Sequence, residues 1–91
     1  MKLAYVRWKD ACSEEADDSN PRPVTPALCE LHEIGFLLGE NDEAVTIGME
    51  QGDDTKPGRW RLHIPRSAIQ EMRVAELDTA FRKKRRTKSV R

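Results

Sequence analysis

The chain of 91 residues is poor in cysteine, in aromatic side chains and in long apolar runs. Its two cysteines cannot form the disulfide framework that holds small secreted domains together. No apolar stretch approaches the length of a membrane span. The start "MKLAYVRWKD" has too short an apolar run for a secretory signal, so we expect a cytoplasmic protein with free thiols and no membrane partner.

Catalytic and cofactor motifs are missing from the sequence as well. Ser13, Ser19, Ser67 and Ser89 lie in no nucleophile elbow, and no glycine-rich loop of the phosphate-binding type occurs. The acidic residues gather in loops where we expect them to be solvated, whereas acid–base catalysis needs carboxyls in unequal environments within a cleft. The sequence therefore predicts a protein that is not an enzyme and has no cofactor.

Zinc and a disulfide are the two alternatives that the cysteines raise. Cys12, Cys29, His32 and His63 would satisfy the ligand count of a tetrahedral zinc site, and Cys29 and His32 have C-x₂-H spacing. A paired C-x₂-C and H-x₃-H pattern is absent, so we expect no metal. Cys12 and Cys29 flank one loop and could be bridged, but a reducing compartment argues against a disulfide.

Charge divides the chain into two parts. Residues 1–77 carry nine Lys/Arg and fifteen Asp/Glu, a net charge of −6, whereas residues 78–91 carry seven Lys/Arg and one Asp, a net charge of +6. This segregation predicts a single domain over residues 1–77, with an acidic loop at 13–26. Residues 78–91 are predicted to be a basic tail that is flexible or helical.

Alternating apolar and polar residues predict an all-β fold. In the first segment Ala4, Val6 and Trp8 fall on one face, while Leu3 and Tyr5 share the other face with charged residues. We place strands at residues 2–11, 31–40, 43–50, 58–64 and 69–77.

Turn signals separate these strands. Three prolines in residues 13–26 make regular structure there unlikely. Asn41 and Asp42 predict a tight hairpin, because both residue types tolerate positive φ. Pro65 lacks an amide hydrogen and cannot continue a central ladder, so "PRSA" predicts a 3₁₀ turn before the last strand. The inward-facing rows are predicted to be Val45, Ile47 and Met49 in the third strand, and Trp60, Leu62 and Ile64 in the fourth.

This order of elements resembles the SH3-like barrel, in which a long loop follows the first strand and a 3₁₀ turn precedes the last. "GRWRLHIPRSAI" looks like the ending of such a domain, with Gly58, Pro65 and Ile69 at the matching positions. The resemblance implies a closed five-stranded barrel, and closure would remove exposed sheet edges. The Sm/Hfq-like barrel is a second relative by shape, and it implies a ring-shaped homo-oligomer that binds RNA.

The chain is also similar to small uncharacterised bacteriophage and prophage proteins. The likeness lies in a W-x-D-A opening, a G-x-L-x-x-E-x-D hairpin and an IP-x-x-x-I close. It implies a phage source, hence the host bacterial cytoplasm, and says little about activity. The matching residues are Trp8, Asp10, Ala11, Gly35, Leu37 or Leu38, Glu40, Asp42, Ile64, Pro65 and Ile69.

The basic tail gives the leading functional hypothesis, a non-catalytic phage accessory module that binds DNA or RNA. Contact between its cations and phosphates would release counterions and be salt-sensitive. The alternative is a protein–protein module, a virion component or an inhibitor of a host protein, that uses the acidic loop and the barrel surface. A tail that only solubilises the protein, and outward arginines that are only solvated, are the plainer interpretations. The candidate nucleic-acid-binding residues are Arg82, Lys83, Lys84, Arg85, Arg86 and Lys88 in the tail, and Arg59, Arg61 and Arg66 near the fourth strand.

Overall fold

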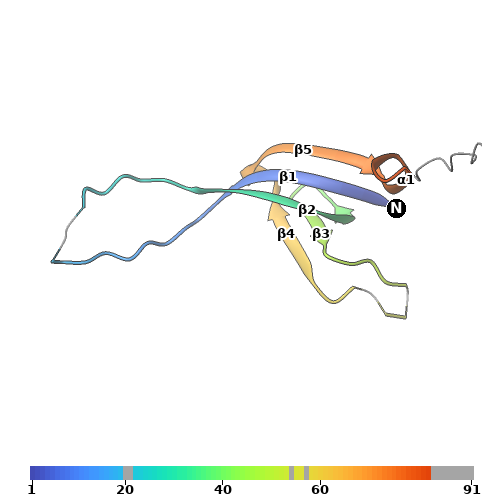
Figure 1. The fold of residues 1–91 in the computed structure, drawn as a ribbon, viewed down its shortest axis with the longest axis horizontal. Helices are drawn as coiled ribbons and strands as arrows, with labels where there is room; N and C mark the ends of the chain where they lie inside the picture. The colour runs from blue at the N-terminus through green and yellow to red at the C-terminus, as the bar shows by residue number, and fades with distance from the viewer. Residues whose placement is uncertain (20–21, 54, 57, 83–91) are drawn as a thin grey trace, which may run out of the picture.

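Five β-strands form one antiparallel sheet in the order β4-β3-β2-β1-β5 (Figure 1). The computed structural model describes residues 1–19, 22–53, 55–56 and 58–82. The elements are β1 (Lys2–Asp10), β2 (Cys29–Glu40), β3 (Ala44–Gly48), β4 (Arg61–Pro65), the 3₁₀ helix η1 (Arg66–Ala68), β5 (Ile69–Glu76) and the helical turn α1 (Leu77–Ala80). The predicted all-β class and the 3₁₀ turn before the last strand are confirmed.

The sheet is open, so the closed barrel that the sequence predicted is not confirmed. Its two edge strands are β4 and β5, and in the described part of the chain they do not pair with each other. β4 follows β3 until Ala44 pairs with Pro65, and β5 follows β1 from Ile69 onward. Pro65 has no amide hydrogen, which suits the end of an edge strand, and η1 then turns the chain toward β1.

β2 bends so that one strand serves two halves of the sheet. Its first part pairs with β1, and its last part pairs with β3 after a register shift between Leu37 and Gly39. The backbone of β3 passes very close to β2 at Gly35, where an added Cβ would lie 2.7 Å from the carbonyl oxygen of Gly48. Such a bulge and close approach let the sheet curve around its apolar face.

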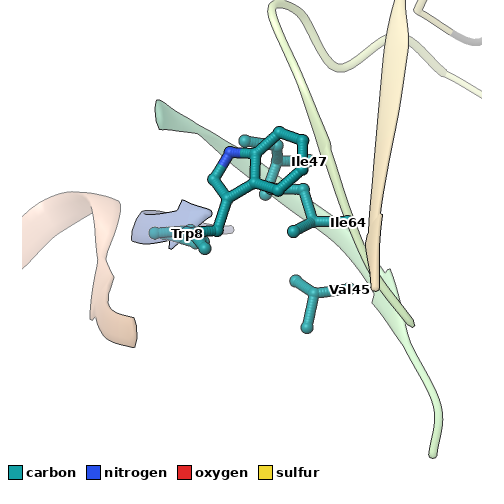
Figure 2. Packing of buried hydrophobic residues seen from close by; sticks show 6 residues of the cluster. Trp8, Val45, Ile47 and Ile64 are labelled. Carbon is teal, nitrogen blue, oxygen red and sulfur yellow. The ribbon is translucent and has the colours of Figure 1, made fainter. Parts of the chain in front are cut away.

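The core is small and lies on the concave side of the curved sheet. Trp8 is the largest member, and its indole lies beside Ile47 and Ile64 (Figure 2). Its buried Nε1 has no hydrogen-bond partner among the described residues. Leu31, Leu37, Leu62, Ala68, Ile69 and Met72 pack around the cluster and remain partly exposed. The buried hydrophobic residues are Ala4, Val6, Trp8, Val45, Ile47 and Ile64.

Two residues predicted to face inward do not. Met49 is 75% exposed because β3 ends at Gly48, and Trp60 is 49% exposed because β4 begins only at Arg61. Beyond those strand ends the backbone no longer alternates its side chains between two faces, so the inward row stops. The core therefore depends on Trp8 alone for aromatic bulk.

The hairpin between β2 and β3 also differs in mechanism from its prediction. No residue in the described ranges has positive φ. Instead the Asn41 side-chain oxygen accepts hydrogen bonds from the backbone N–H groups of Glu43 and Ala44, both at 2.9 Å. Asparagine therefore forms this turn by capping backbone donors with its side chain rather than by adopting a left-handed conformation.

The described parts of the segment between β1 and β2 project away from the sheet, whereas α1 lies against it (Figure 1). α1 contacts β5 and β1, and the Leu77 N–H donates to the Met1 carbonyl oxygen at 2.9 Å. The tail residues from Lys83 to Arg91 lie outside the described residues. Within the described ranges, no helix is both long enough and apolar enough to cross a membrane.

Candidate functional site

The tail residues that carry the leading hypothesis begin next to α1. Phe81 follows the helical turn and Arg82 is exposed at the end of the described chain. The other five predicted contacts in the tail are outside the described residues: Lys83, Lys84, Arg85, Arg86 and Lys88. α1 therefore fixes where the basic segment starts, beside β5 and β1.

Two of the three arginines predicted near β4 are held by glutamates. Arg59 donates from Nε to Glu50 Oε1 at 2.9 Å and from Nη2 to Glu50 Oε2 at 3.3 Å, a bidentate pair. Arg66 donates to Glu40 at 2.8 Å and to the Asn41 carbonyl oxygen. The hydrogen bonds from Arg59 hold the pKa of Glu50 below its ordinary value. Each pair is neutral overall, so neither arginine adds net positive charge to the surface of β4.

Arg61 is placed differently, beside a polar hollow of about 450 Å³. It is exposed and has no ion pair with a described carboxylate. His63 shares the hollow, and its Nδ1 is hydrogen-bonded to the Thr46 hydroxyl at 2.7 Å. Asp53 lies at the same hollow and is ionised readily, because hydrogen bonds from Thr55 and Lys56 lower its pKa. The carboxylate opposes the two basic groups, so the hollow has no strong preference for anions.

The side of β2, β1 and β5 that faces away from the core carries both polar and apolar residues, and we call it the outer face. Its residues are Leu3, Tyr5, Arg7 and Lys9 in β1, Glu30, His32 and Ile34 in β2, and Glu71, Arg73 and Ala75 in β5. The register sets these residues in rows across three strands, since Tyr5 lies between Ile34 and Arg73, and Arg7 lies between His32 and Glu71. Side chains opposite each other on neighbouring strands are close enough to interact.

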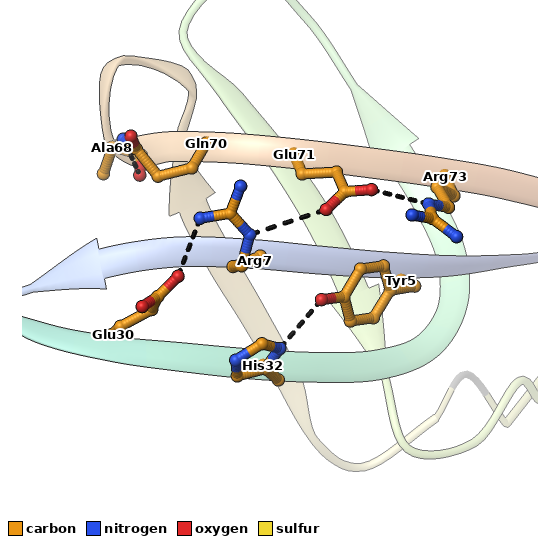
Figure 3. Close-up of polar contacts among 8 residues, drawn as sticks. All are labelled: Tyr5, Arg7, Glu30, His32, Ala68, Gln70, Glu71 and Arg73. Carbon is orange, nitrogen blue, oxygen red and sulfur yellow. Dashed lines mark hydrogen bonds and ion pairs between the residues drawn. The ribbon is translucent and has the colours of Figure 1, made fainter.

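Arg7 joins the polar end of the outer face into one network (Figure 3). Its Nη1 lies 2.7 Å from Glu30 Oε1 and its Nε lies 3.5 Å from Glu71 Oε1, while the other oxygen of Glu71 accepts from Arg73 Nε at 2.6 Å. The hydrogen bond from Arg7 lowers the pKa of Glu30, and that from Arg73 lowers the pKa of Glu71. Arg7 and Arg73 are therefore balanced by these two carboxylates, while Lys9 lies opposite Glu30 at the same end of the face.

Tyr5 lies at the centre of the outer face. Its hydroxyl is hydrogen-bonded to His32 Nδ1 at 2.8 Å, and the two ring centroids are 5.9 Å apart. The guanidinium carbon of Arg73 lies 5.9 Å from the centroid of the Tyr5 ring, within range of a cation–π contact. An aromatic ring, an imidazole and a planar cation are thus presented together on a sheet surface.

The opposite end of the outer face is apolar and hollowed. A hollow of about 190 Å³ lies between the sheet and α1, with Leu3, Tyr5, Ile34, Val74 and Phe81 among its lining side chains. Ile34 is 75% exposed and Phe81 is 68% exposed, although both are large and apolar. The sequence pattern did not predict a site at these residues. The pairing of Ile34 with Tyr5 across β1 and β2 was the missing information, and Phe81 next to the basic run was the one available signal.

The candidate zinc ligands are distributed over different contacts. His32 is hydrogen-bonded to Tyr5, and His63 to Thr46 on another part of the sheet. Cys12 and Cys29 do lie together at the base of the long loop, where the Cys12 thiol donates to the Ala27 carbonyl oxygen at 3.7 Å. A hydrogen bond from Cys12 raises the pKa of the Cys29 thiol. Among the residues that the structure describes, no three His, Cys, Asp or Glu side chains are arranged to hold a metal ion.

No protein-family model, curated protein or solved structure matches this chain. The function proposed below therefore depends on the contacts described above and on the charge distribution of the sequence.

Proposed function

We propose that this chain is a non-catalytic binding module whose basic segment, residues 78–91, contacts the phosphates of DNA or RNA. The observation that carries the proposal is the charge segregation: seven Lys/Arg and a single Asp follow a domain of net charge −6. Clustered cations of this kind bind polyanions through counterion release, independently of base sequence.

The ion pairs in the body support the tail, rather than β4, as the phosphate-binding element. Arg59 and Arg66 are already neutralised by Glu50 and Glu40. Breaking such a pair to contact a phosphate would leave a carboxylate close to that phosphate, which is unfavourable. Arg61 is the strand arginine best able to assist the tail.

We also propose that the sheet is an open form of the SH3-like small barrel. The order of strands along the chain and the η1 turn before β5 both fit this architecture. Ile64 of edge strand β4 is buried in the cluster against which Ile69 and Met72 of edge strand β5 pack, so the two ends of the sheet curve around a shared core. The phage or prophage source stays a prediction from the resemblance of the sequence.

A salt titration with matched charge variants tests the nucleic-acid proposal. Binding of a labelled oligonucleotide is followed by fluorescence anisotropy for the full chain and for a variant with six tail cations changed to Gln: Arg82, Lys83, Lys84, Arg85, Arg86 and Lys88. For the full chain, log K should fall linearly with log salt, with a slope of about −0.9 for each duplex phosphate contacted. The Gln variant should lose both the affinity and the slope.

The control is a double change of Arg59→Gln and Arg66→Gln, which removes two cations that are already paired. This control should bind nearly as tightly as the unaltered chain. Equal binding by the six-Gln variant and the unaltered chain, or binding that does not respond to salt, would contradict the proposal.

A second candidate function, protein binding through the long loop, is favoured by the shape and composition of that loop. The loop projects from the sheet and carries Glu14, Glu15, Asp17 and Asp18 (Figure 1). Val24 and Leu28 are exposed on the returning part, and Val24 lines a hollow together with these acidic residues. Capture of a defined partner that survives nuclease treatment and disappears when residues 13–26 are replaced by a short Gly/Ser linker would establish this function instead.

A further inference from the structure

Exposed apolar side chains gather on the outer face where the basic tail begins. Ile34 of the outer face and Phe81 after α1 are exposed large hydrophobic residues, and both line the hollow of about 190 Å³ between the sheet and α1. Phe81 directly precedes Arg82, the first cation of the tail. The apolar hollow therefore lies beside the point at which the basic segment begins.

The groups around this hollow are of the kind that bind flat aromatic ligands. Tyr5 and Phe81 offer aromatic rings, and Arg73 offers a planar guanidinium that already lies over the Tyr5 ring. Proteins that bind single strands combine basic tracks for the backbone with aromatic and arginine surfaces for the bases. Arg7 and Arg73 are already paired with Glu30 and Glu71, so the part of the face beside the hollow is suited to a base rather than to a phosphate backbone.

We propose that the hollow between Ile34, Tyr5 and Phe81 takes an unpaired nucleobase of a single-stranded nucleic acid whose phosphates are bound by the basic tail. This inference rests on the proposed function and adds a substrate class to it. In a duplex, each base is stacked on its neighbours and its faces are covered, so the hollow has no ring to receive. The tail alone would bind both forms, and the hollow adds affinity for the single strand only.

Three oligonucleotide probes of equal length test this inference by fluorescence anisotropy: a single strand, the corresponding duplex, and a single strand made of abasic sites. The protein variants are Ile34→Ala and Phe81→Ala. Stacking of one base on an aromatic side chain is worth roughly 1–3 kcal/mol, so Phe81→Ala should bind the single strand about fivefold or more weakly. Ile34→Ala removes apolar contact with the base and should also weaken binding of the single strand. The same variants should bind the duplex and the abasic strand as the unaltered chain does.

Met49→Ala is the matched control, because Met49 is as exposed as Ile34 but lies at the end of β3. It should leave the affinity for all three probes unchanged. Since Ile34 and Phe81 are largely exposed, both variants should keep the thermal melting curve of the unaltered chain, as measured by circular dichroism.

Two results would overturn the inference, and they are distinguishable from failure of the proposed function. Equal affinity for the single strand and the abasic strand, with normal salt dependence, would leave the tail as the only binding element. A dimer in light scattering that Ile34→Ala dissociates, with unchanged oligonucleotide binding, would show that the hollow is covered by a second copy of the chain. Loss of binding in the six-Gln tail variant tests the proposed function separately.

Discussion

The two sides of β1 show how this small protein separates stability from surface chemistry. Ala4, Val6 and Trp8 point inward and are buried, whereas the alternate residues, among them Tyr5 and Arg7, point outward and remain partly exposed. The inner row belongs to the only buried apolar cluster among the described residues, and the outer row belongs to the network of ion pairs and hydrogen bonds. Because successive side chains of a strand point to opposite faces, β1 contributes one row to the buried core and the other row to the polar surface network.

This difference teaches where the molecule tolerates change. Six buried side chains form the core of the described fold, so each of them carries a large share of a small hydrophobic stabilisation. The outer face contributes mostly exposed ion pairs, which are worth little to stability. A ligand could therefore be accommodated on the outer face without disturbing the fold, and the following variants test that division.

The largest effect is expected from the same substitution made on the two faces. Ile47→Ala removes a side chain that is 2% exposed, and the cavity left behind should destabilise the protein by about 2–5 kcal/mol. Ile34→Ala removes an identical side chain from the outer face, where the change should lie within about 0.5 kcal/mol. Urea denaturation followed by circular dichroism measures both values. A loss of stability in Ile34→Ala close to that of Ile47→Ala would break the comparison, because the outer face would then be part of the core.

A second pair of variants tests whether the close approach of β3 to β2, which lets the sheet curve around its core, is needed for stability. Gly35→Ala would place a Cβ 2.7 Å from the Gly48 carbonyl oxygen, and backbone cannot move aside cheaply, so we expect a loss of about 1–3 kcal/mol. Gly39→Ala is the control, because nothing lies within 4 Å of its added Cβ. Thermal unfolding should separate the two by several degrees. Equal melting temperatures would mean that the close approach of β3 to β2 is not required for the fold.

The inner row was predictable from the sequence, and the outer surfaces were much less so. Alternation in β1 identified Ala4, Val6 and Trp8 correctly, because burial on one side of a strand leaves a direct period-two signal. The same logic failed for Met49 and Trp60, since the position at which a strand ends depends on its partner's hydrogen bonds. The alternation of apolar and polar residues could not predict closure of the sheet either, because it indicates where strands form and not whether the two edge strands pair.

The contacts of the candidate site were harder to predict than the core, because they depend on which strands pair and in which register. Contacts such as that of Arg7 with Glu71 join residues 64 positions apart, and only the pairing of β1 with β5 brings them together. The ion pairs that neutralise Arg59 and Arg66 also involve side chains outside β4. Counting charges along the fourth strand therefore overstated its positive potential, whereas the charge of the tail is a property of the sequence itself.

A smaller effect on stability is expected from the two cysteines at the base of the long loop. Asp10 pairs with Cys29 at the last step of the β1–β2 ladder, Cys12 follows two residues later, and its thiol is hydrogen-bonded to that of Cys29. Oxidised glutathione should convert the two thiols into an intramolecular disulfide, with release of two molecules of reduced glutathione. The bond would close the loop between them and raise the melting temperature. Mass spectrometry should show a loss of two hydrogens and no free thiol.

Cys12→Ser and Cys29→Ser provide the controls for this bond, since each leaves a single thiol that can only form a mixed disulfide or a dimer. Persistent mixed disulfides with glutathione in the unaltered chain would show that the two thiols do not meet in solution.

The smallest effect on stability is expected from the ion pairs of the outer face, and it should appear as a melting temperature that depends on pH. Arg7 lowers the pKa of Glu30 and contributes to the lowered pKa of Glu71, so the stability it provides is present above the ordinary glutamate pKa of about 4.3 and is lost as the pH falls through the lowered values. Arg7→Gln should therefore melt at a lower temperature than the unaltered chain at neutral pH, and the two should converge in acid. Circular dichroism melts across this range measure the difference, with Arg61→Gln as the control because no described carboxylate pairs with Arg61. Should the Arg7→Gln difference persist in acid, the stem of Arg7 would be acting through packing, and the outer face would contribute to the fold by contact as well as by charge.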